Sequence, residues 1–301
     1  MSIRPVKKLS TSQPVVEGAG VHLRRAFGFG DTSDTDPFLL FDDFRNDRPD
    51  DYLPGFPWHP HRGIETITYV LAGNVEHGDS LGNTGSLEAG DVQWMTAGSG
   101  IIHQEMPHGD DRGRMHGFQL WANLPSSLKM TDPRYQDVKS ADIPEIVDDD
   151  ETRVRIICGS FWGATGPVDG VAAEPQYLDV WVPPLTRKRL PVETRRHAFA
   201  YVFGGSGGFG NASDPRPVAT EAAGSDAPPI PSAIEDRSLV VFDRGDEVVV
   251  DSGESGIRFL LVSGKPLGEP VAWAGPIVMN TEAEVRQAFT EYRDGSFLKH
   301  R

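Results

Sequence analysis

Residues 59–73 read HPHRGIETITYVLAG, and this stretch contains both a strand signal and a pair of potential ligands. Its second part, residues 64–71, is rich in β-branched side chains and runs into a glycine, which is typical of a β-strand closed by a turn. Its first part places His59 and His61 two positions apart. Because alternate residues of a strand point to the same face, the stretch predicts two imidazoles on one side of a β-sheet.

A second pair with the same spacing, His103 and Glu105, follows shortly after Gly98 and Gly100. If its strand lies beside the strand of the first pair, three imidazoles and one carboxylate converge on one point. Such ligands accept iron, zinc, nickel, copper or manganese. Four protein ligands on an ion that prefers six leave two positions for substrate, water or dioxygen. We therefore predict a catalytic metal site; the alternative is a polar cluster without metal.

Short strands and turns continue along the rest of the chain. The 33 Gly and 24 Pro favour short strands joined by tight turns. Runs that predict further strands lie at residues 38–44, 92–96, 117–122, 154–158, 177–182, 198–203, 238–242 and 257–262. No amphipathic helices separate them. This pattern predicts an all-β fold, an antiparallel sandwich or barrel.

The organisation of the chain suggests two domains. Residues 122–155 are polar and rich in turns, so we place the connection near residue 140. The two halves resemble a degenerate repeat, because residues 66–73 and 199–205 are similar and each precedes a Gly-Asp turn. We expect a metal-binding domain at 1–140 and a second domain at 141–301 without metal ligands.

Two segments of the second half have a distinct composition. Residues 204–236 are dominated by Gly, Ala, Ser, Pro and Asp, which predicts a mobile surface loop. Near the end, Thr281 and Glu284 have the spacing of a capping box. An apolar stripe at helical spacing follows, so we expect a short helix that covers a sheet.

Net charge and cysteine content exclude several classes of protein. The formal charge of −15 argues against nucleic-acid binding, which needs Lys and Arg, and against docking on an anionic membrane. The single cysteine, Cys158, cannot form an internal disulfide. No apolar run approaches the ~20 residues that span a bilayer, and the first residues lack the apolar core of a secretion signal. We expect a cytoplasmic protein.

Glu65 is ambiguous by sequence. It shares odd parity with His59 and His61, so it faces the same way if the strand is continuous. It could be a direct metal ligand, with Glu105 acting elsewhere, or it could hold a ligand histidine by its second nitrogen. A salt bridge with Arg62 is equally compatible with the sequence.

The remaining histidines are expected to lie outside the site. His77, His108 and His116 are near turns, so we place them at the surface or at a pocket rim. We interpret the others as structural: His22, His197 and His300.

Several motifs resemble those of the pirin family of the cupin superfamily. They lie at residues 59–66, 90–98, 100–107 and 120–125, and the end of the chain, residues 264–281, is similar to the end of the pirin C-terminal domain. The resemblance covers nearly the whole chain, although residues 204–236 look longer than is usual for the family. It implies two cupin β-barrels face to face, a short C-terminal helix, and a single metal, usually iron, in the first barrel.

Carried over by position, the resemblance assigns the metal ligands as His59, His61, His103 and Glu105, and it places Glu65 behind the ligands. Some pirins oxidise quercetin with dioxygen, so our leading hypothesis is a flavonol 2,3-dioxygenase that uses Fe(II) or another divalent transition metal. In it Glu105 would act as the general base that takes the 3-hydroxyl proton. Its partners would be a small aromatic substrate and dioxygen. The alternative is a non-enzymatic, redox-sensing iron protein that modulates a transcription factor or metabolic enzyme.

Overall fold

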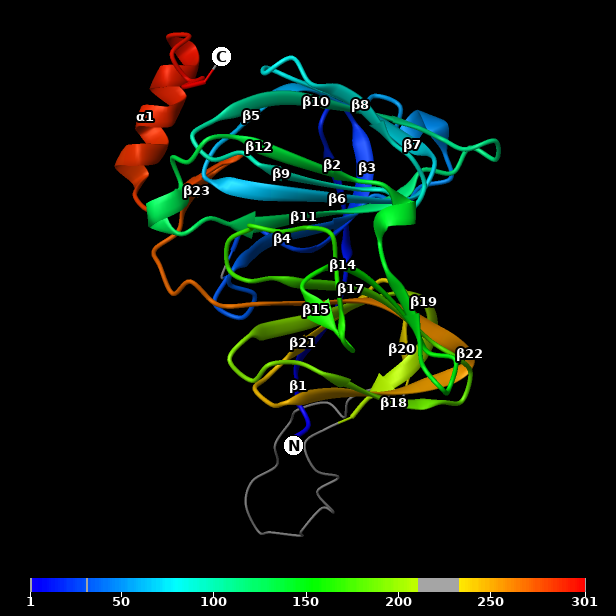
Figure 1. Cartoon of the computed structure of the whole chain (residues 1–301). Coiled ribbons are helices and arrows are strands. Elements are labelled where there is room, and N and C mark those ends of the chain that lie inside the picture. Colours follow the sequence, from blue (N-terminus) through cyan, green and yellow to red (C-terminus); the bar gives the residue numbers. More distant parts are fainter. Residues whose placement is uncertain (1, 31, 211–232, 301) are drawn as a thin grey trace, which may run out of the picture.

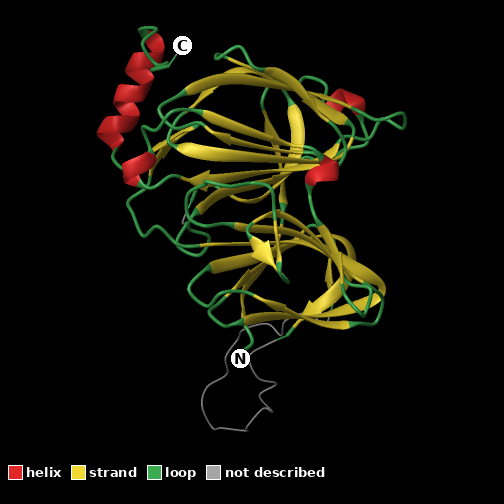
Figure 2. Ribbon diagram, viewed as in Figure 1, coloured by secondary structure: helices red, strands yellow, loops and turns green. Residues whose placement is uncertain are grey.

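The computed structural model describes residues 2–30, 32–210 and 233–300. Strands dominate both halves of the molecule, and the C-terminal helix α1 (Glu282–Arg293) lies at its edge (Figures 1 and 2). This confirms the predicted all-β fold with a short C-terminal helix. The sheets do not close into complete barrels; the fold is the related β-sandwich arrangement.

Two antiparallel sheets form the first half. The seven-stranded sheet has the order β12 (Arg134–Val138), β9 (Val92–Thr96), β6 (Ile64–Ala72), β11 (His116–Asn123), β4 (Phe38–Asp43), β3 (Val21–Phe27) and β2 (Gln13–Glu17). The four-stranded sheet has the order β5 (Phe56–His61), β10 (Ile101–His108), β7 (Asn74–Asp79) and β8 (Thr84–Leu87). Val70 of one sheet and Val75 of the other belong to the same buried apolar cluster, which lies between them.

A nine-stranded sheet forms the second half. Its path is β1 (Val6–Thr11), β21 (Ser238–Phe242), β19 (His197–Phe209), β22 (Glu247–Gly264), β17 (Gln176–Val182), β14 (Arg153–Cys158) and β13 (Glu145–Val147); β18 (Arg187–Pro191) also pairs with β22, and β20 (Ile234–Glu235) with β19. The register of β19 on β22 shifts beside Gly204 and again beside Gly205. Such bulges bend long strands, which lets one sheet enclose its own core.

The remaining elements are short. Two hairpins pair β15 (Ser160–Phe161) with β16 (Ala164–Thr165) and β23 (Ala272–Ala274) with β24 (Ile277–Met279). Three 3₁₀ turns lie at Pro49–Asp51, Ser126–Leu128 and Ser140–Asp142. The helix α1 spans Glu282–Arg293 and begins with the predicted capping box of Thr281 and Glu284. Among the described residues, none of the helices has the length and apolar character needed to cross a membrane.

One apolar core joins the two halves. It contains Ile67 and Phe118 from the seven-stranded sheet together with Phe199 and Leu260 from the nine-stranded sheet, all of them fully or almost fully buried. Phe118 also stacks edge-on against Tyr201 across this boundary, with 5.9 Å between ring centroids. The halves therefore bury a common interface instead of being joined by a linker alone.

Each end of the chain lies in the other half of the molecule (Figure 1). The N-terminal strand β1 belongs to the second half, and the C-terminal helix lies beside the first half. Strand β1 pairs with β21 in the nine-stranded sheet, and Arg62 of the first half bridges to Ile277 of β24. Near residue 140 the chain does pass from one sheet to the other, since β12 pairs in the first half and β13 in the second. The predicted division into 1–140 and 141–301 therefore does not hold for the two ends of the chain, because each end pairs with strands of the other half.

The segment 204–236 differs in part from its prediction as a surface loop. Strand β19 continues to Phe209, and Ile234–Glu235 forms β20 against it. Residues 211–232 lie outside the described residues.

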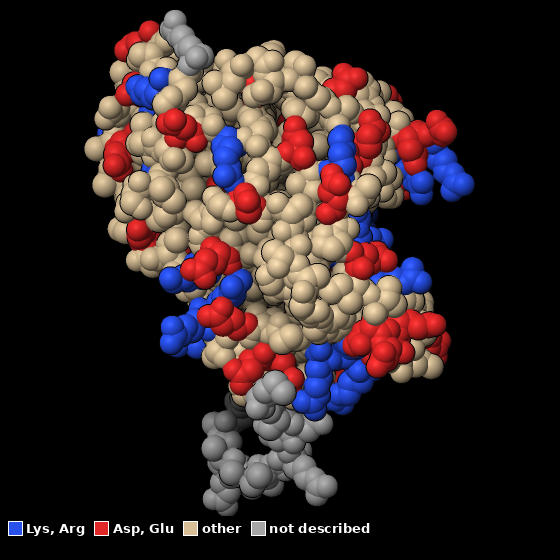
Figure 3. Space-filling view, viewed as in Figure 1, with Lys and Arg blue, Asp and Glu red and all other residues tan. Residues whose placement is uncertain are grey.

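On the face seen in Figure 3, acidic and basic side chains are intermixed.

Candidate metal centre

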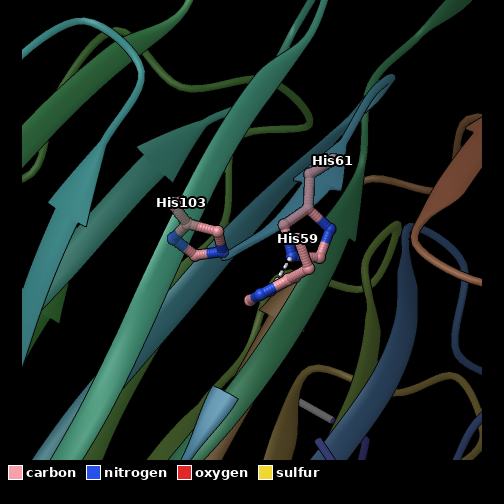
Figure 4. A group of neighbouring side chains, drawn as sticks. All are labelled: His59, His61 and His103. Carbon is pink, nitrogen blue, oxygen red and sulfur yellow. Dashed lines mark hydrogen bonds between the residues drawn. The ribbon is translucent and has the colours of Figure 1, made fainter. Parts of the chain in front are cut away.

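Three histidines from two neighbouring strands meet inside the first half (Figure 4). His59 and His61 lie on β5, and His103 lies on β10, directly opposite His59 in the antiparallel register. One ligand atom from each of the three lies within 4.8 Å of the others. The predicted pairing of the two ligand strands is therefore confirmed, and among residues 2–30, 32–210 and 233–300 this is the one such group.

Backbone carbonyls orient two of the rings. His59 Nδ1 lies 2.9 Å from the oxygen of Pro57, and His61 Nδ1 lies 3.3 Å from the oxygen of Pro276. Each Nδ1–H can donate to its carbonyl, which leaves Nε2 as the acceptor that faces the cluster. The two Nε2 atoms are 3.1 Å apart. Two nitrogens at ~2.1 Å from one ion and at right angles to each other would be ~3 Å apart.

His103 shows most directly that the cluster suits a cation. It is buried, and neither of its ring nitrogens has a hydrogen-bond partner. Burial lowers the pKa of His59 and lowers the pKa values of His61 and His103 well below the ordinary value, so all three rings are neutral at pH 7. Unpaired buried nitrogens are costly, and a divalent metal ion would satisfy one of the two on His103. The residues therefore fit a metal ion held by three imidazoles.

Glu105 lies beside this group but is not part of it. A β-bulge between His103 and Glu105 shifts the pairing, so that Glu105 lies opposite Phe56. Glu105 Oε1 accepts a hydrogen bond of 3.1 Å from Thr68 Oγ1. Burial raises the pKa of Glu105 to about 7. Its assignment as the fourth ligand stays a prediction.

A pocket of about 430 Å³ opens onto His59, His61 and Glu105. This volume lies within the range of ~300–1,000 Å³ that is common for small-molecule sites. Its walls are largely apolar, with Leu40, Phe44, Tyr52, Phe56, Met115 and Trp121 among the lining side chains. Polar groups are few, and two of them, Arg25 and Asp42, form a bidentate pair with both distances at 2.8 Å. The pocket therefore suits a mostly apolar ligand that carries a few polar groups.

The C-terminal segment forms one wall of the centre, which the sequence did not reveal. Besides the carbonyl of Pro276, it supplies Trp273, whose ring lies 6.0 Å from Trp121, and Trp121 in turn packs edge-on against His61. The buried amine of Lys129 ties the segment down by donating to the carbonyls of Gly63 and Val278. The motif at residues 275–281 was visible in the sequence, but no local pattern connects it to His61.

Glu65 turns away from the metal centre, contrary to the parity argument. Gly63, with φ +78°, separates β5 from β6, and the two strands lie in different sheets. Glu65 consequently faces the second half together with Ile67, and its Oε1 accepts from Thr96 at 2.8 Å. The alternative salt bridge is also absent, because Arg62 pairs with Glu291 at 2.7 Å.

The prediction for His77 was also wrong, since it is buried in the first half instead of lying at the surface or at the rim of a pocket. It lies opposite Glu105 on β7, and its Nε2 is 3.1 Å from Gln93 Nε2. His77 is buried because β7 pairs with β10, and the nearby turn in the sequence did not indicate this pairing. His108, in contrast, has a side chain that is 46% exposed, in agreement with the prediction.

We expect Glu65→Gln to stabilise the protein at pH 8 and to change its stability little at pH 4. Burial raises the pKa of Glu65 to about 7, and its Oε2 has no hydrogen-bond partner. Between the ordinary pKa near 4.3 and about 7, the folded state binds more protons than the unfolded state, so this carboxyl costs stability as the pH rises. Removing the charge should recover up to ~3 kcal/mol of unfolding free energy, measured by urea denaturation at both pH values. Unchanged metal affinity in this variant would agree with its position; a large loss would make Glu65 a ligand after all.

The fold and the histidine cluster together define a two-domain cupin protein with a candidate metal site in its first domain. Residues 20–122 match the Pirin family, and residues 177–298 match the Pirin C-terminal cupin domain. The chain belongs to the pirin family.

Individual relatives agree with this assignment. The chain is 41% identical to a "Pirin-like protein" of Caulobacter vibrioides, over 99% of this chain and 100% of that one. It is 40% identical to a Pseudomonas aeruginosa protein named "Putative quercetin 2,3-dioxygenase", over 97% of each chain. Among solved structures, a quercetin 2,3-dioxygenase from Acinetobacter baumannii is similar with a TM-score of 0.83 and 28% identity, covering 98% of this chain and 99% of that one.

Proposed function

We propose that this protein is a metal-dependent dioxygenase of the quercetin 2,3-dioxygenase type, which opens flavonols or related enol-bearing aromatics. The observation that carries the proposal is His103, whose unpartnered ring nitrogens lie buried next to His59 and His61, and these two histidines line a mostly apolar pocket of about 430 Å³. A cation site at the wall of such a pocket would bring an oxygen of a bound aromatic molecule to the metal. A relative by sequence is named a putative quercetin 2,3-dioxygenase, and a similar solved structure is named a quercetin 2,3-dioxygenase. Both names support the proposed reaction.

Each group in the site has a role in this proposal. His59, His61 and His103 would hold the metal, with Glu105 as fourth ligand, and Fe(II) is the first candidate ion. The bound metal would supply Lewis acidity and an electron path between substrate and dioxygen. Glu105, which lines the pocket, would accept the proton of the substrate hydroxyl. The apolar walls would exclude water and stack on the aromatic rings.

The decisive experiment is anaerobic loading of the metal-free protein with Fe(II), followed by addition of quercetin and dioxygen. We expect loss of quercetin absorbance together with stoichiometric dioxygen uptake, at a rate well above that of the same concentration of free Fe(II). Turnover no faster than free iron would overturn the proposal. If Fe(III) then changed the binding of a protein partner, the redox-sensing alternative would replace it.

We expect Glu105→Gln to lower kcat by ~100-fold, because the amide cannot accept the hydroxyl proton. Steady-state kinetics at saturating metal measure this effect, and a metal titration shows whether the amide also weakens binding. Glu76→Gln is the matched control, since this carboxylate lies on the adjacent strand β7 and its side chain is 66% exposed. Full activity of the Glu105 variant would remove this residue from the proposed mechanism.

A further inference from the structure

A second pocket lies on the nine-stranded sheet, away from the histidines, and six charged or aromatic residues line it. It has a volume of about 340 Å³ and is lined by Glu145, Arg153, Arg155, Asp179, Trp181 and Arg258. The strand register explains why they meet. Trp181 of β17 lies between Arg153 of β14 and Arg258 of β22, and Asp179 lies opposite Arg155. Residues that are paired across strands or two apart along one share a face of the sheet, so all of them point the same way.

This face of the sheet is the one that packs against the first half of the molecule. Tyr177 and Leu260 on the same face belong to the core shared by the two halves. Further along the strands this face extends beyond the shared core, so that Arg153 is exposed and Trp181 is half-buried. The pocket therefore lies at the rim of the interface between the halves, open to solvent.

The positive charge in the pocket is only partly compensated. Asp179 is buried, holds Arg258 by two hydrogen bonds of 3.0 and 2.6 Å, and also accepts from Tyr69 Oη at 2.8 Å. Arg155 donates to Tyr69 Oη at 2.9 Å and to oxygens of Ser140. Among the described residues, neither Arg153 nor Arg155 forms an ion pair with a carboxylate.

Arg153 is the group best placed to meet a ligand. Its guanidinium lies 5.5 Å from the centre of the Trp181 ring, and no hydrogen bond engages it among the described residues. Arg155 and Arg258, in contrast, are held in place by hydrogen bonds to their partners. The pocket therefore has two oriented guanidinium groups and a third, that of Arg153, which can turn toward a bound ligand. Three guanidinium groups against two carboxylates make the pocket net positive in a chain of net charge −15.

We infer that this pocket binds a small oxyanion, a carboxylate or phosphate compound of metabolite size, with Trp181 packing against its carbon skeleton. Guanidinium groups match both oxyanions through paired N–H donors. The volume admits a small molecule, whereas an excess of negative charge over most of the chain would repel a large polyanion. The inference is independent of the chemistry at the metal centre.

The test uses inorganic phosphate and succinate as probes, titrated into the full-length protein and followed by tryptophan fluorescence and calorimetry. The two probes distinguish a phosphate ligand from a carboxylate ligand. We expect saturable binding of at least one, weakened ~10-fold or more by Arg153→Ala, because a hydrogen bond to a charged group is lost. Glu145→Gln should tighten binding, because it removes a repelling carboxylate at the pocket. This gain cannot result from damage to the fold.

Two controls locate the binding. Arg187→Ala removes one positive charge from β18 of the same half, where the side chain is 59% exposed, and should leave the affinity within twofold of wild type. His61→Ala should also retain it, since the anion does not bind at the metal centre. Absence of saturable binding by either probe, or equal losses in the Arg153 and Arg187 variants, would overturn the inference. Binding of an acidic peptide alone would overturn it too, and would assign the pocket to a protein partner.

Discussion

The variant His61→Ala is expected to lose both metal binding and flavonol turnover. The His61 ring packs against both other rings, with centroids 4.8 Å from His59 and 5.0 Å from His103. Without His61, only two imidazoles and the proposed ligand Glu105 would remain to hold the ion. We expect metal affinity to fall by more than ~100-fold, since even partners behind the ligands are worth ~10–100-fold. Elemental analysis and metal titration measure the affinity, and the activity should drop to that of free iron.

His108→Ala provides the matched control, because His108 lies on the same strand as His103 with its side chain 46% exposed. It should retain its metal and its activity. Circular dichroism and thermal unfolding of the metal-free proteins should show that both variants fold. If the His61 variant bound metal as tightly as wild type, the candidate centre would be wrong, whatever the activity.

The second large effect is expected for Gly63→Ala, which should destabilise the fold and weaken metal binding together. A Cβ at position 63 would lie 1.9 Å from the carbonyl oxygen of Val278, and the backbone there has φ +78°. The left-handed conformation alone costs ~1–2 kcal/mol for a residue with a side chain. Contact with backbone at such a distance forces the C-terminal segment to move, so we expect a total loss above ~3 kcal/mol. Because that segment carries the Pro276 carbonyl, His61 would lose its orientation as well.

Gly295→Ala separates conformational strain from this contact. Gly295 has φ +75°, almost the same as Gly63, but a Cβ there would meet nothing within 4 Å. We expect it to cost only ~1–2 kcal/mol, with metal affinity unchanged. Urea denaturation and metal titration of both variants give the comparison. Equal losses of stability would mean that packing of the C-terminal segment on Gly63 is unimportant.

Much of the fold could be predicted from sequence because the signals are local. The β-branched run at 64–71 and the capping box at Thr281 depend on neighbours in the chain. The strand was confirmed and is one residue longer than predicted, and the capping box was confirmed at the predicted residues. The ligand pairs were also local, since two-residue spacing places His59 and His61 on one face. The pairing of their strand with that of His103 was only a condition of the predicted site, and the structure shows that it is met.

Long-range pairing decided the rest. Glu65 has the same parity as His61, yet Gly63 carries the chain from one sheet to another, so the two side chains end on different sides. The carbonyl of Pro276 and the cluster of arginines at the rim between the halves likewise come from segments that are far apart in sequence.

The sequence by itself determined the all-β class, the helix and the histidines that share a face, because side-chain alternation is a property of each strand alone. The tertiary structure decided which face points toward the pocket, which strand ends meet there, and which buried groups remain unpaired. Those properties depend on sheet order and on packing between the halves, and the hydrophobic free energy that sets them does not depend on distance along the chain.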